Sequence, residues 1–254
     1  MRRLFFVVTI ISIILFANIA YSDTLKVGIS TGYPPVAFKK NSKIVGIEAD
    51  LARAVGDETG MTIKFIDMPW EKLEGALKKG DIDVVMSGVS VTQEREKRVD
   101  FVEPYMIVGQ MVLIKADNIM SLSSKVAMYG VGKRFAVKNK TTGQQFVEKE
   151  FPGSKIMAFE TVAQGIEALK TNKVDYFVHD APTIWQYTIM PETQDSELFG
   201  LYEYMTREPL AWAVKKGNSN LLAKLNKALT NMHSRGLVNK IINQWIPMKI
   251  EVGN

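Results

Sequence analysis

Short strand-like runs alternate with stretches of helical periodicity along almost the whole chain. The first run, Leu25 to Ser30, is followed by a helical pattern that begins near Ile47 and ends at Gly60, and then by a second run from Thr62 to Ile66. Strands that alternate with helices in this way favour a parallel sheet with helices on its faces and right-handed crossovers between neighbouring strands. The sequence therefore predicts an α/β protein.

The alternation starts again after an extended run from Ile107 to Lys115, which indicates a second unit. A chain of 254 residues is long enough to bury the cores of two modest lobes. We also expect a loop from Met190 to Gly200 and a strand from Leu210 to Lys215. The second set consists of strands at 134–137, 156–159 and 174–178 and helices at 142–150 and 162–169, and two amphipathic helices follow at 220–232 and 237–245.

The first 22 residues have the pattern of a secretion signal. Arg2 and Arg3 precede an apolar run from Leu4 to Ala17, and small residues at Ala20 and Ser22 suit a signal peptidase. We expect cleavage after Ser22. The apolar run is interrupted by polar residues and is short for a membrane-spanning helix, so an uncleaved anchor is the less favoured alternative.

Charge and cysteine content restrict the partners and the compartment. The formal net charge is +5, and loss of Arg2 and Arg3 with a segment that contains no acid leaves +3 on the mature chain. The cations form no stripe, which argues against nucleic-acid binding. The chain has no cysteine, which excludes disulfides, thiolate catalysis, cysteine zinc sites and a lipid anchor on cysteine. We expect a soluble periplasmic protein without a cofactor.

One candidate binding edge lies between Gly80 and Arg95. The apolar run Ile82 to Met86 has the pattern of a strand buried on both faces of a parallel sheet, and ligands of open α/β sheets bind at the carboxyl ends of such strands. Arg95 follows a predicted helix N-cap at Thr92, and an arginine can hold a carboxylate with two parallel hydrogen bonds. The alternative is an ordinary turn with an exposed arginine. Hydroxyl and backbone N–H groups of the turn come from Ser87, Gly88 and Ser90.

Further candidates follow other predicted strands. Thr141 and Thr142 begin a helix and offer hydroxyl and free N–H groups to a carboxylate, whereas Asp180 leaves a buried strand where it can pair with an ammonium group. Tyr33 and Trp70 stand just past strand ends, where aromatic rings can wall a pocket. Each residue has an ordinary alternative as a helix cap or a core side chain. Their common position at strand carboxyl ends predicts a single site.

Metal binding and acid–base catalysis find little support. His179 stands beside Asp180, but the chain has only one other histidine and no cysteine, so we expect no metal site. Asp81 and Asp83 share one face of a strand, and Asp83 is expected to hold nearby backbone at the strand entrance.

Six segments carry a family resemblance: GYPPVAF at 32–38, VGIEADLARAVGDETG at 45–60, PWEKLEGALKKGDIDVVMSGVSVTQEREKRVDFVEPY at 69–105, NKTTG at 139–143, VDYFVHDAP at 174–182 and KIINQW at 240–245. Through them the chain resembles the family 3 solute-binding proteins of ABC transporters, the periplasmic binders of polar amino acids. The similarity extends over residues 23–247. The resemblance implies a two-lobed periplasmic binding protein of type II, or Venus flytrap, with two crossover hinge strands. We then expect lobe 1 to comprise 23–108 and 208–254, and lobe 2 to comprise 109–207.

The resemblance also implies roles for the candidate residues. By motif position, Arg95 holds the α-carboxylate of the ligand, helped by backbone at Ser90 and Thr142. The α-amino group is taken by Asp180 together with Gly88 or the nearby Ser87. The side chain of the ligand is stacked by Tyr33 and Trp70.

Three departures from the family pattern bear on the site. Val36 replaces the usual phenylalanine after the two prolines, which thins the aromatic wall. Lys140 replaces the usual glycine before Thr141, which bears on the backbone angle of the turn and adds a cation near the ligand. The segment from Thr206 to Trp212 is more similar to binding lobes attached to cell-wall lytic enzymes or sensor kinases.

The sequence thus predicts a monomeric, non-enzymatic periplasmic protein. It binds an amino acid or a related small zwitterion by hinge closure and delivers it to an ABC permease in the inner membrane. One alternative is an enzyme of the cyclohexadienyl dehydratase type on the same fold, with Glu48, Glu103 or Glu160 as general acid. The other alternative is a sensor that reports its ligand to a membrane partner.

Overall fold

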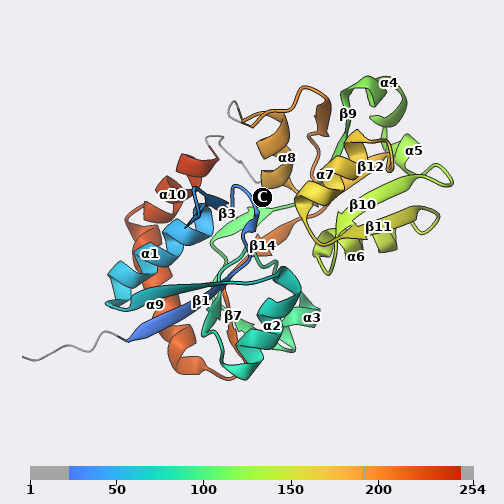
Figure 1. Ribbon diagram of the computed structural model, residues 1–254. Helices are drawn as coiled ribbons and strands as arrows, with labels where there is room; N and C mark the ends of the chain where they lie inside the picture. The colour runs from blue at the N-terminus through green and yellow to red at the C-terminus, as the bar shows by residue number, and fades with distance from the viewer. Residues whose placement is uncertain (1–22, 191–192, 247–254) are drawn as a thin grey trace, which may run out of the picture.

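The computed structural model describes residues 23–190 and 193–246 and has two lobes, each built on its own five-stranded sheet (Figure 1). The predicted signal segment and its cleavage site lie outside the described residues. Among the helices within these limits, none combines the length and the apolar character that spanning a bilayer requires. The predicted two-lobed α/β architecture is confirmed.

The sheet of the first lobe has the strand order β5-β1-β6-β15-β7. The strands are β1 (Thr24–Ile29), β5 (Thr62–Asp67), β6 (Val84–Val85), β7 (Val99–Phe101) and β15 (Ala213–Lys215). The first three run parallel, but β15 pairs antiparallel with both β6 and β7. The expected parallel pairing of β6 therefore holds on the side of β1 only, because the return segment of the chain enters the sheet on the other side in the opposite direction.

Helices cover both faces of this sheet (Figure 1). Val84 of β6 belongs to the core beneath α1 (Ile47–Thr59), α9 (Ser219–Ser234) and α10 (Leu237–Trp245). Its neighbour Val85 belongs to a second core beneath α2 (Trp70–Lys79). Successive side chains of a strand point to opposite faces, so the apolar run that predicts β6 serves both cores. Gly60 and Gly80 end α1 and α2 in the left-handed conformation, as expected.

The second lobe repeats this plan with the strand order β11-β10-β12-β9-β13. Its strands are β9 (Gln110–Lys115), β10 (Arg134–Lys138), β11 (Lys155–Phe159), β12 (Tyr176–Asp180) and β13 (Leu198–Leu201). Its helices are η1 (Ala116–Asn118), α4 (Ile119–Leu122), α5 (Lys125–Met128), α6 (Thr142–Glu150), α7 (Val162–Lys170) and α8 (Ala181–Thr188). The loop predicted to reach Gly200 is wrong at its end, because the apolar run LFGL that follows the polar segment pairs with β9 as the edge strand β13.

Two short strands, β8 (Met106–Val108) and β14 (Glu208–Leu210), pair antiparallel where the chain passes between the lobes (Figure 1). Each belongs to a run that the sequence predicts as one strand and that is broken in the structure. Gly109 separates β8 from β9, and a Cβ there would lie 2.2 Å from the carbonyl oxygen of Thr206. The close approach of the two crossing segments therefore requires glycine at this position.

A small sheet at the cleft side of the first lobe consists of β2 (Gly32–Tyr33), β3 (Ala37–Lys40) and β4 (Lys43–Val45). It follows β1 and carries Tyr33, which is buried. The short helix α3 (Gln93–Glu96) follows the turn after β6. These two elements place polar side chains of the first lobe opposite the second lobe.

Candidate functional site

All nine candidate binding residues line one small cavity between the lobes, which has about 20 Å³ of free space. A cavity of this size holds about one water molecule. Side chains of both lobes thus fill most of the cleft, and little free space remains between them. The candidates are Tyr33, Trp70, Ser87, Gly88, Ser90, Arg95, Thr141, Thr142 and Asp180, and three unpredicted residues, Gln110, Lys138 and His179, complete the lining.

Arg95 projects from α3 toward the cavity. Thr92 caps the helix as expected, because its Oγ1 accepts a hydrogen bond from the backbone N–H of Arg95 at 3.2 Å. The guanidinium folds back over the preceding turn and donates to the carbonyl oxygen of Ser90 at 2.8 Å. Burial lowers the pKa of Arg95, an effect opposed chiefly by Glu208 and Asp180. An arginine stays charged under these conditions, so the cleft contains a cation with donors to spare.

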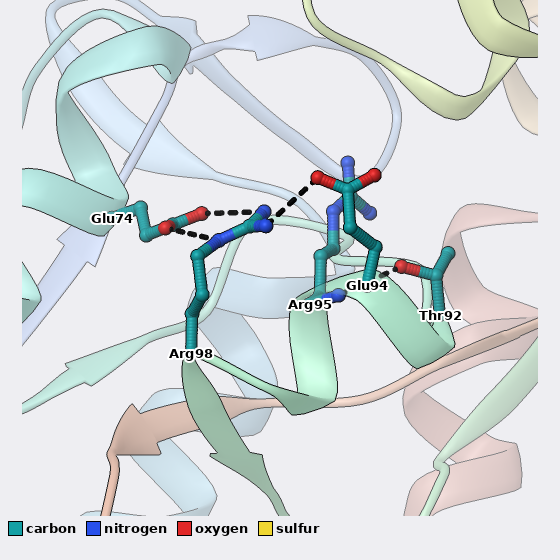
Figure 2. A network of polar contacts seen from close by, with 5 residues as sticks. All are labelled: Glu74, Thr92, Glu94, Arg95 and Arg98. Atoms are coloured by element: carbon teal, nitrogen blue, oxygen red, sulfur yellow. Dashed lines mark hydrogen bonds and ion pairs between the residues drawn. The ribbon is translucent and has the colours of Figure 1, made fainter.

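The acids nearest to Arg95 along the helices are taken by another arginine (Figure 2). Arg98 bridges Glu74 of α2 at 2.6 Å and Glu94 of α3 at 2.8 Å. In Figure 2 the only dashed line from Arg95 runs to Thr92. The exposed ion pairs of Arg98 thus leave the Arg95 guanidinium available to the cleft.

Asp180 faces the cavity from the end of β12. It occupies the N-cap position of α8, but its side chain makes no capping hydrogen bond. Instead its carboxylate accepts from the Tyr33 hydroxyl at 2.5 Å and from Gln110 Nε2 at 2.5 Å. Burial, with a further contribution from Glu208, raises the pKa of Asp180 to about 7. The helix-cap alternative is therefore wrong, and the buried carboxylate is directed at the interface between the lobes.

The two threonines after β10 have different tasks. Thr141 caps α6, since its Oγ1 accepts from the N–H of Gln144 at 3.3 Å. Thr142 points into the cleft and donates to Glu208 Oε2 at 2.6 Å. The preceding Lys140 adopts the left-handed φ of 58° that glycine usually supplies, and its carbonyl oxygen accepts a hydrogen bond from Trp70 Nε1 at 3.0 Å.

Glu208 is a second buried acid of the cleft, and the sequence analysis missed it. Its carboxylate lies on β14 and accepts hydrogen bonds from both lobes, from Ser90 Oγ at 2.7 Å and Thr142 Oγ1 at 2.6 Å. Two further donors are Gln110 Nε2 at 3.0 Å and Thr206 Oγ1 at 2.7 Å. Glu208 and Leu210 lie two residues apart on one strand, so their side chains point to the same buried face. An acid two residues before a predicted buried leucine is the signal in the sequence that could have identified Glu208.

Gln110 links the two acids. Its Nε2 donates to both Asp180 and Glu208, and it stands at the start of β9, immediately after the crossing. A Cβ on Gly143 would lie 2.7 Å from Gln110 Oε1, so glycine at the start of α6 admits this side chain. Gln110 is not a candidate from the sequence because it lies inside the run predicted as one strand, whereas the candidates follow the carboxyl ends of predicted strands.

The turn after β6 is fixed from behind. Ser87 Oγ accepts from the N–H of Ser30 at 3.0 Å, and the N–H of Gly88 donates to Glu48 Oε1 at 2.7 Å. Gly88 has a φ of 68°, and a Cβ there would lie 2.6 Å from Cε1 of Tyr33. Glycine is thus required both for the backbone angle and for the close approach of the aromatic ring.

Glu48 is fully buried in the first lobe, behind this turn. Its carboxylate accepts from three donors, the N–H of Gly88, the Tyr105 hydroxyl at 2.8 Å and Trp212 Nε1 at 3.0 Å. Burial is the main cause that raises the pKa of Glu48 to about 7, and the three donors oppose it. The carboxylate does not line the cleft cavity, so its task is to position the turn.

Lys138 and His179 complete the wall of the cavity. Lys138 is 5% exposed at the end of β10, and its Nζ lies 5.6 Å from the ring centre of Trp70. His179 packs edge-on against Tyr33 and stacks on Phe177. Burial, aided by Lys138, lowers the pKa of His179 to about 3, so the imidazole is neutral.

The remaining acids considered from the sequence lie elsewhere. Glu103 and Glu160 are exposed and do not line the cleft cavity. Asp83 holds the backbone at the strand entrance as expected, because its Oδ2 accepts from the N–H of Lys26 at 2.8 Å. A larger cavity of about 310 Å³ lies beyond Trp70 and Arg95, between α2 and α3, and it does not include Asp180.

Comparison with known proteins gives a consistent result. The model of the bacterial extracellular solute-binding proteins, family 3, matches residues 25–248. The chain is 28% identical to the ABC transporter arginine-binding protein 1 of Escherichia coli, over 89% of this chain and 92% of that protein. It is 31% identical to the ABC transporter glutamine-binding protein GlnH of Bacillus subtilis, over 91% of this chain and 84% of that protein.

Solved structures agree with these relatives. An ancestral arginine-binding protein bound to arginine superposes with a TM-score of 0.80 at 36% identity, over 87% of this chain and 97% of the other. An ancestral amino acid-binding protein, described as a precursor of cyclohexadienyl dehydratase, gives a TM-score of 0.81 at 33% identity, over 87% and 95%. The two relatives from Escherichia coli and Bacillus subtilis are binding proteins, and the family consists of solute-binding proteins. This supports the expectation of a non-enzymatic protein.

Proposed function

Because the chain belongs to the bacterial extracellular solute-binding proteins of family 3, we propose that it binds one α-amino acid between its lobes as the binding component of an ABC transporter. The observation that carries the proposal is the pair of groups of opposite charge on one cavity, the half-buried Arg95 from the first lobe and the buried Asp180 from the second. A zwitterion presents the complementary pair of charges. The named relatives, which bind arginine and glutamine, support the same ligand class.

In the proposed complex Arg95 grips the α-carboxylate, with Ser90 and Thr142 beside it. Asp180 receives the α-ammonium group near Ser87 and Gly88. Tyr33 and Trp70 pack on the side chain, and Thr141 holds the start of α6. The ligand carboxylate then accepts hydrogen bonds from Arg95 of one lobe and Thr142 of the other. The ligand therefore stabilises the closed form through contacts that the open form lacks.

We divide the chain into lobes at the two places where it passes from one lobe to the other. We assign residues 23–108 and 208–254 to lobe 1 and residues 109–207 to lobe 2, with β8 and β14 as the hinge, which the pairing of these two strands supports. An export signal at residues 1–22 delivers the monomer to the periplasm without a lipid anchor, and the closed form docks on a permease of the inner membrane.

Amino-acid binding is tested on the purified chain from residue 23 by thermal shift with each of the common L-amino acids. A ligand at 100 times its dissociation constant adds about 2.7 kcal/mol, which raises the Tm of a domain of this size by about 5–10 °C. We expect at least one amino acid to do so, and its decarboxylated and deaminated analogues not to. The proposal fails if no amino acid shifts the Tm, or if the analogues shift it equally.

The raised pKa of Asp180 predicts that acid weakens binding. Near pH 5.5 the carboxyl is mostly protonated, because its pKa is about 7 in the closed cleft without ligand. The ligand ammonium requires the ionised form, so affinity falls as pH falls through this pKa, by about tenfold or more between pH 8 and pH 5.5. Titration calorimetry with a ligand that does not itself titrate in this range measures the change. Asp180→Asn should bind weakly with a flat pH profile, and an unchanged wild-type affinity at pH 5.5 would contradict the prediction.

A further inference from the structure

The cleft contains one charged group whose partner is not in the protein. The other charged groups on or beside the cavity have partners: Glu208 accepts from four donors, Asp180 from two, and Arg95 donates to Ser90. By contrast, Lys138 Nζ makes no hydrogen bond and no ion pair within residues 23–190 and 193–246. In the described part of the chain, Lys138 Nζ has a cation–π contact with the ring of Trp70.

This isolation of Lys138 is costly. The side chain is 5% exposed, and an ammonium largely withdrawn from water without an acceptor is unfavourable. Burial lowers the pKa of Lys138, while the more distant charges of Asp180, Glu71 and Glu160 oppose the shift. A lysine that lines the cavity without a hydrogen-bond acceptor in the protein can obtain one from a ligand in the cleft.

The backbone charges of the bound zwitterion do not require Lys138. In the proposed function the α-carboxylate pairs with Arg95 and the α-ammonium with Asp180, so both charges of the ligand backbone are already paired without Lys138. Lys138 and Arg95 lie near the same aromatic ring, with Nζ at 5.6 Å and the Arg95 Cζ at 5.5 Å from the Trp70 ring centre. Two cations therefore flank the ring of Trp70, and the acids Glu71 and Glu74 lie nearby without an ion pair to Lys138.

We infer that Lys138 selects an amino acid whose side chain ends in an acceptor oxygen, a carboxamide or a carboxylate, and disfavours arginine and lysine. This inference rests on the proposed function and deepens it. A guanidinium or ammonium on the ligand would meet two cations beside Trp70, and like charges at close range in a buried site repel strongly. An aliphatic side chain would leave Lys138 without an acceptor. A side-chain oxygen satisfies it.

Calorimetry with six ligands tests this specificity: L-glutamine, L-asparagine, L-glutamate, L-aspartate, L-arginine and L-lysine. We expect the tightest of the first four to bind the wild type at least tenfold more tightly than either basic amino acid. Lys138→Met should lose at least tenfold of that affinity, and Lys138→Gln, which keeps a hydrogen-bond donor, should lose less. Lys155→Met is the control, because it removes one positive charge from an exposed position on β11. Its affinities should stay within twofold of the wild type.

The outcomes separate this inference from the proposed function. Preferred binding of arginine or lysine by the wild type, or unchanged affinities in Lys138→Met, overturns the role of Lys138 and leaves amino-acid binding intact. Absence of binding for every amino acid overturns both. A loss of affinity counts for Lys138 only if the Tm and far-ultraviolet circular dichroism of both Lys138 variants match those of the wild type, and Lys138→Gln decides the test if Lys138→Met does not fold.

Discussion

Arg95→Ala is expected to weaken amino-acid binding by about 10- to 150-fold, the equivalent of about 1.5–3 kcal/mol for a lost charge-assisted hydrogen bond. The reason is the position of the guanidinium. It is folded over the turn by its bond to the Ser90 carbonyl, and Arg98 rather than Arg95 neutralises the nearby acids. The variant would leave the ligand carboxylate in a closed cleft without its cation. Calorimetry with the tightest ligand measures the loss.

Two variants refine this test. Arg95→Lys retains the charge but not the planar fork, so its affinity should lie between those of the wild type and Arg95→Ala. Arg98→Ala removes an arginine three residues further along, whose exposed ion pairs contribute little to stability. Its affinity should remain within twofold of the wild type. Equal affinities of Arg95→Ala and the wild type for every amino acid would disprove the assigned role.

Glu48→Ala is expected to destabilise the protein by about 4 kcal/mol, because it removes one acceptor from three buried donors, each of which costs about 1–3 kcal/mol when left unpaired. The donors are the Gly88 N–H, the Tyr105 hydroxyl and Trp212 Nε1. For a protein of this size the loss lowers the Tm by about 10 °C. Urea unfolding and calorimetry measure the two quantities.

The isosteric Glu48→Gln serves as the comparison. Its amide oxygen can still accept from Gly88 and Tyr105, whereas its amide nitrogen meets the donor of Trp212, so the loss should be smaller than in Glu48→Ala. Binding should also weaken in Glu48→Ala at a temperature where it is folded, because the turn that holds Gly88 is then less fixed. A Tm of Glu48→Ala within 2 °C of the wild type would show that the three hydrogen bonds contribute little.

The elements of the fold could be predicted where local signals agree. α1 and α2 combine apolar periodicity with a glycine at the end, and β1 and β5 are short strand-like runs rich in apolar residues. β13 is itself a short apolar run, LFGL, but it directly follows a polar, weakly periodic segment, and the expected loop therefore extends over most of it. The direction of β15 could not be predicted, because it depends on the second passage of the chain between the lobes and not on any property of residues 213–215.

The same contrast holds for the site. Tyr33, Trp70, Arg95, Thr142 and Asp180 share a positional rule, the carboxyl end of a predicted strand, and the structure brings all of them to one cavity. The cleft residues Gln110, Glu208 and Lys138 are not among the candidates from the sequence. Gln110 lies inside the run predicted as one strand, and Glu208 lies on a crossing, so the rule does not reach them; Lys138 directly follows the strand predicted at 134–137 and satisfies the rule. Their place in the cleft follows from how the two lobes face each other, which is a property of tertiary packing.

The double crossing of the chain also determines the order in which the two sheets can be completed. All five strands of the second sheet come from one continuous stretch, residues 110–201, so this sheet can form as soon as that stretch is available. The first sheet has β15, from residues 213–215, between β6 and β7. Until the chain has returned through β14, β6 and β7 have no common neighbour. The lobe whose first strand is made earliest is therefore the last to close its sheet.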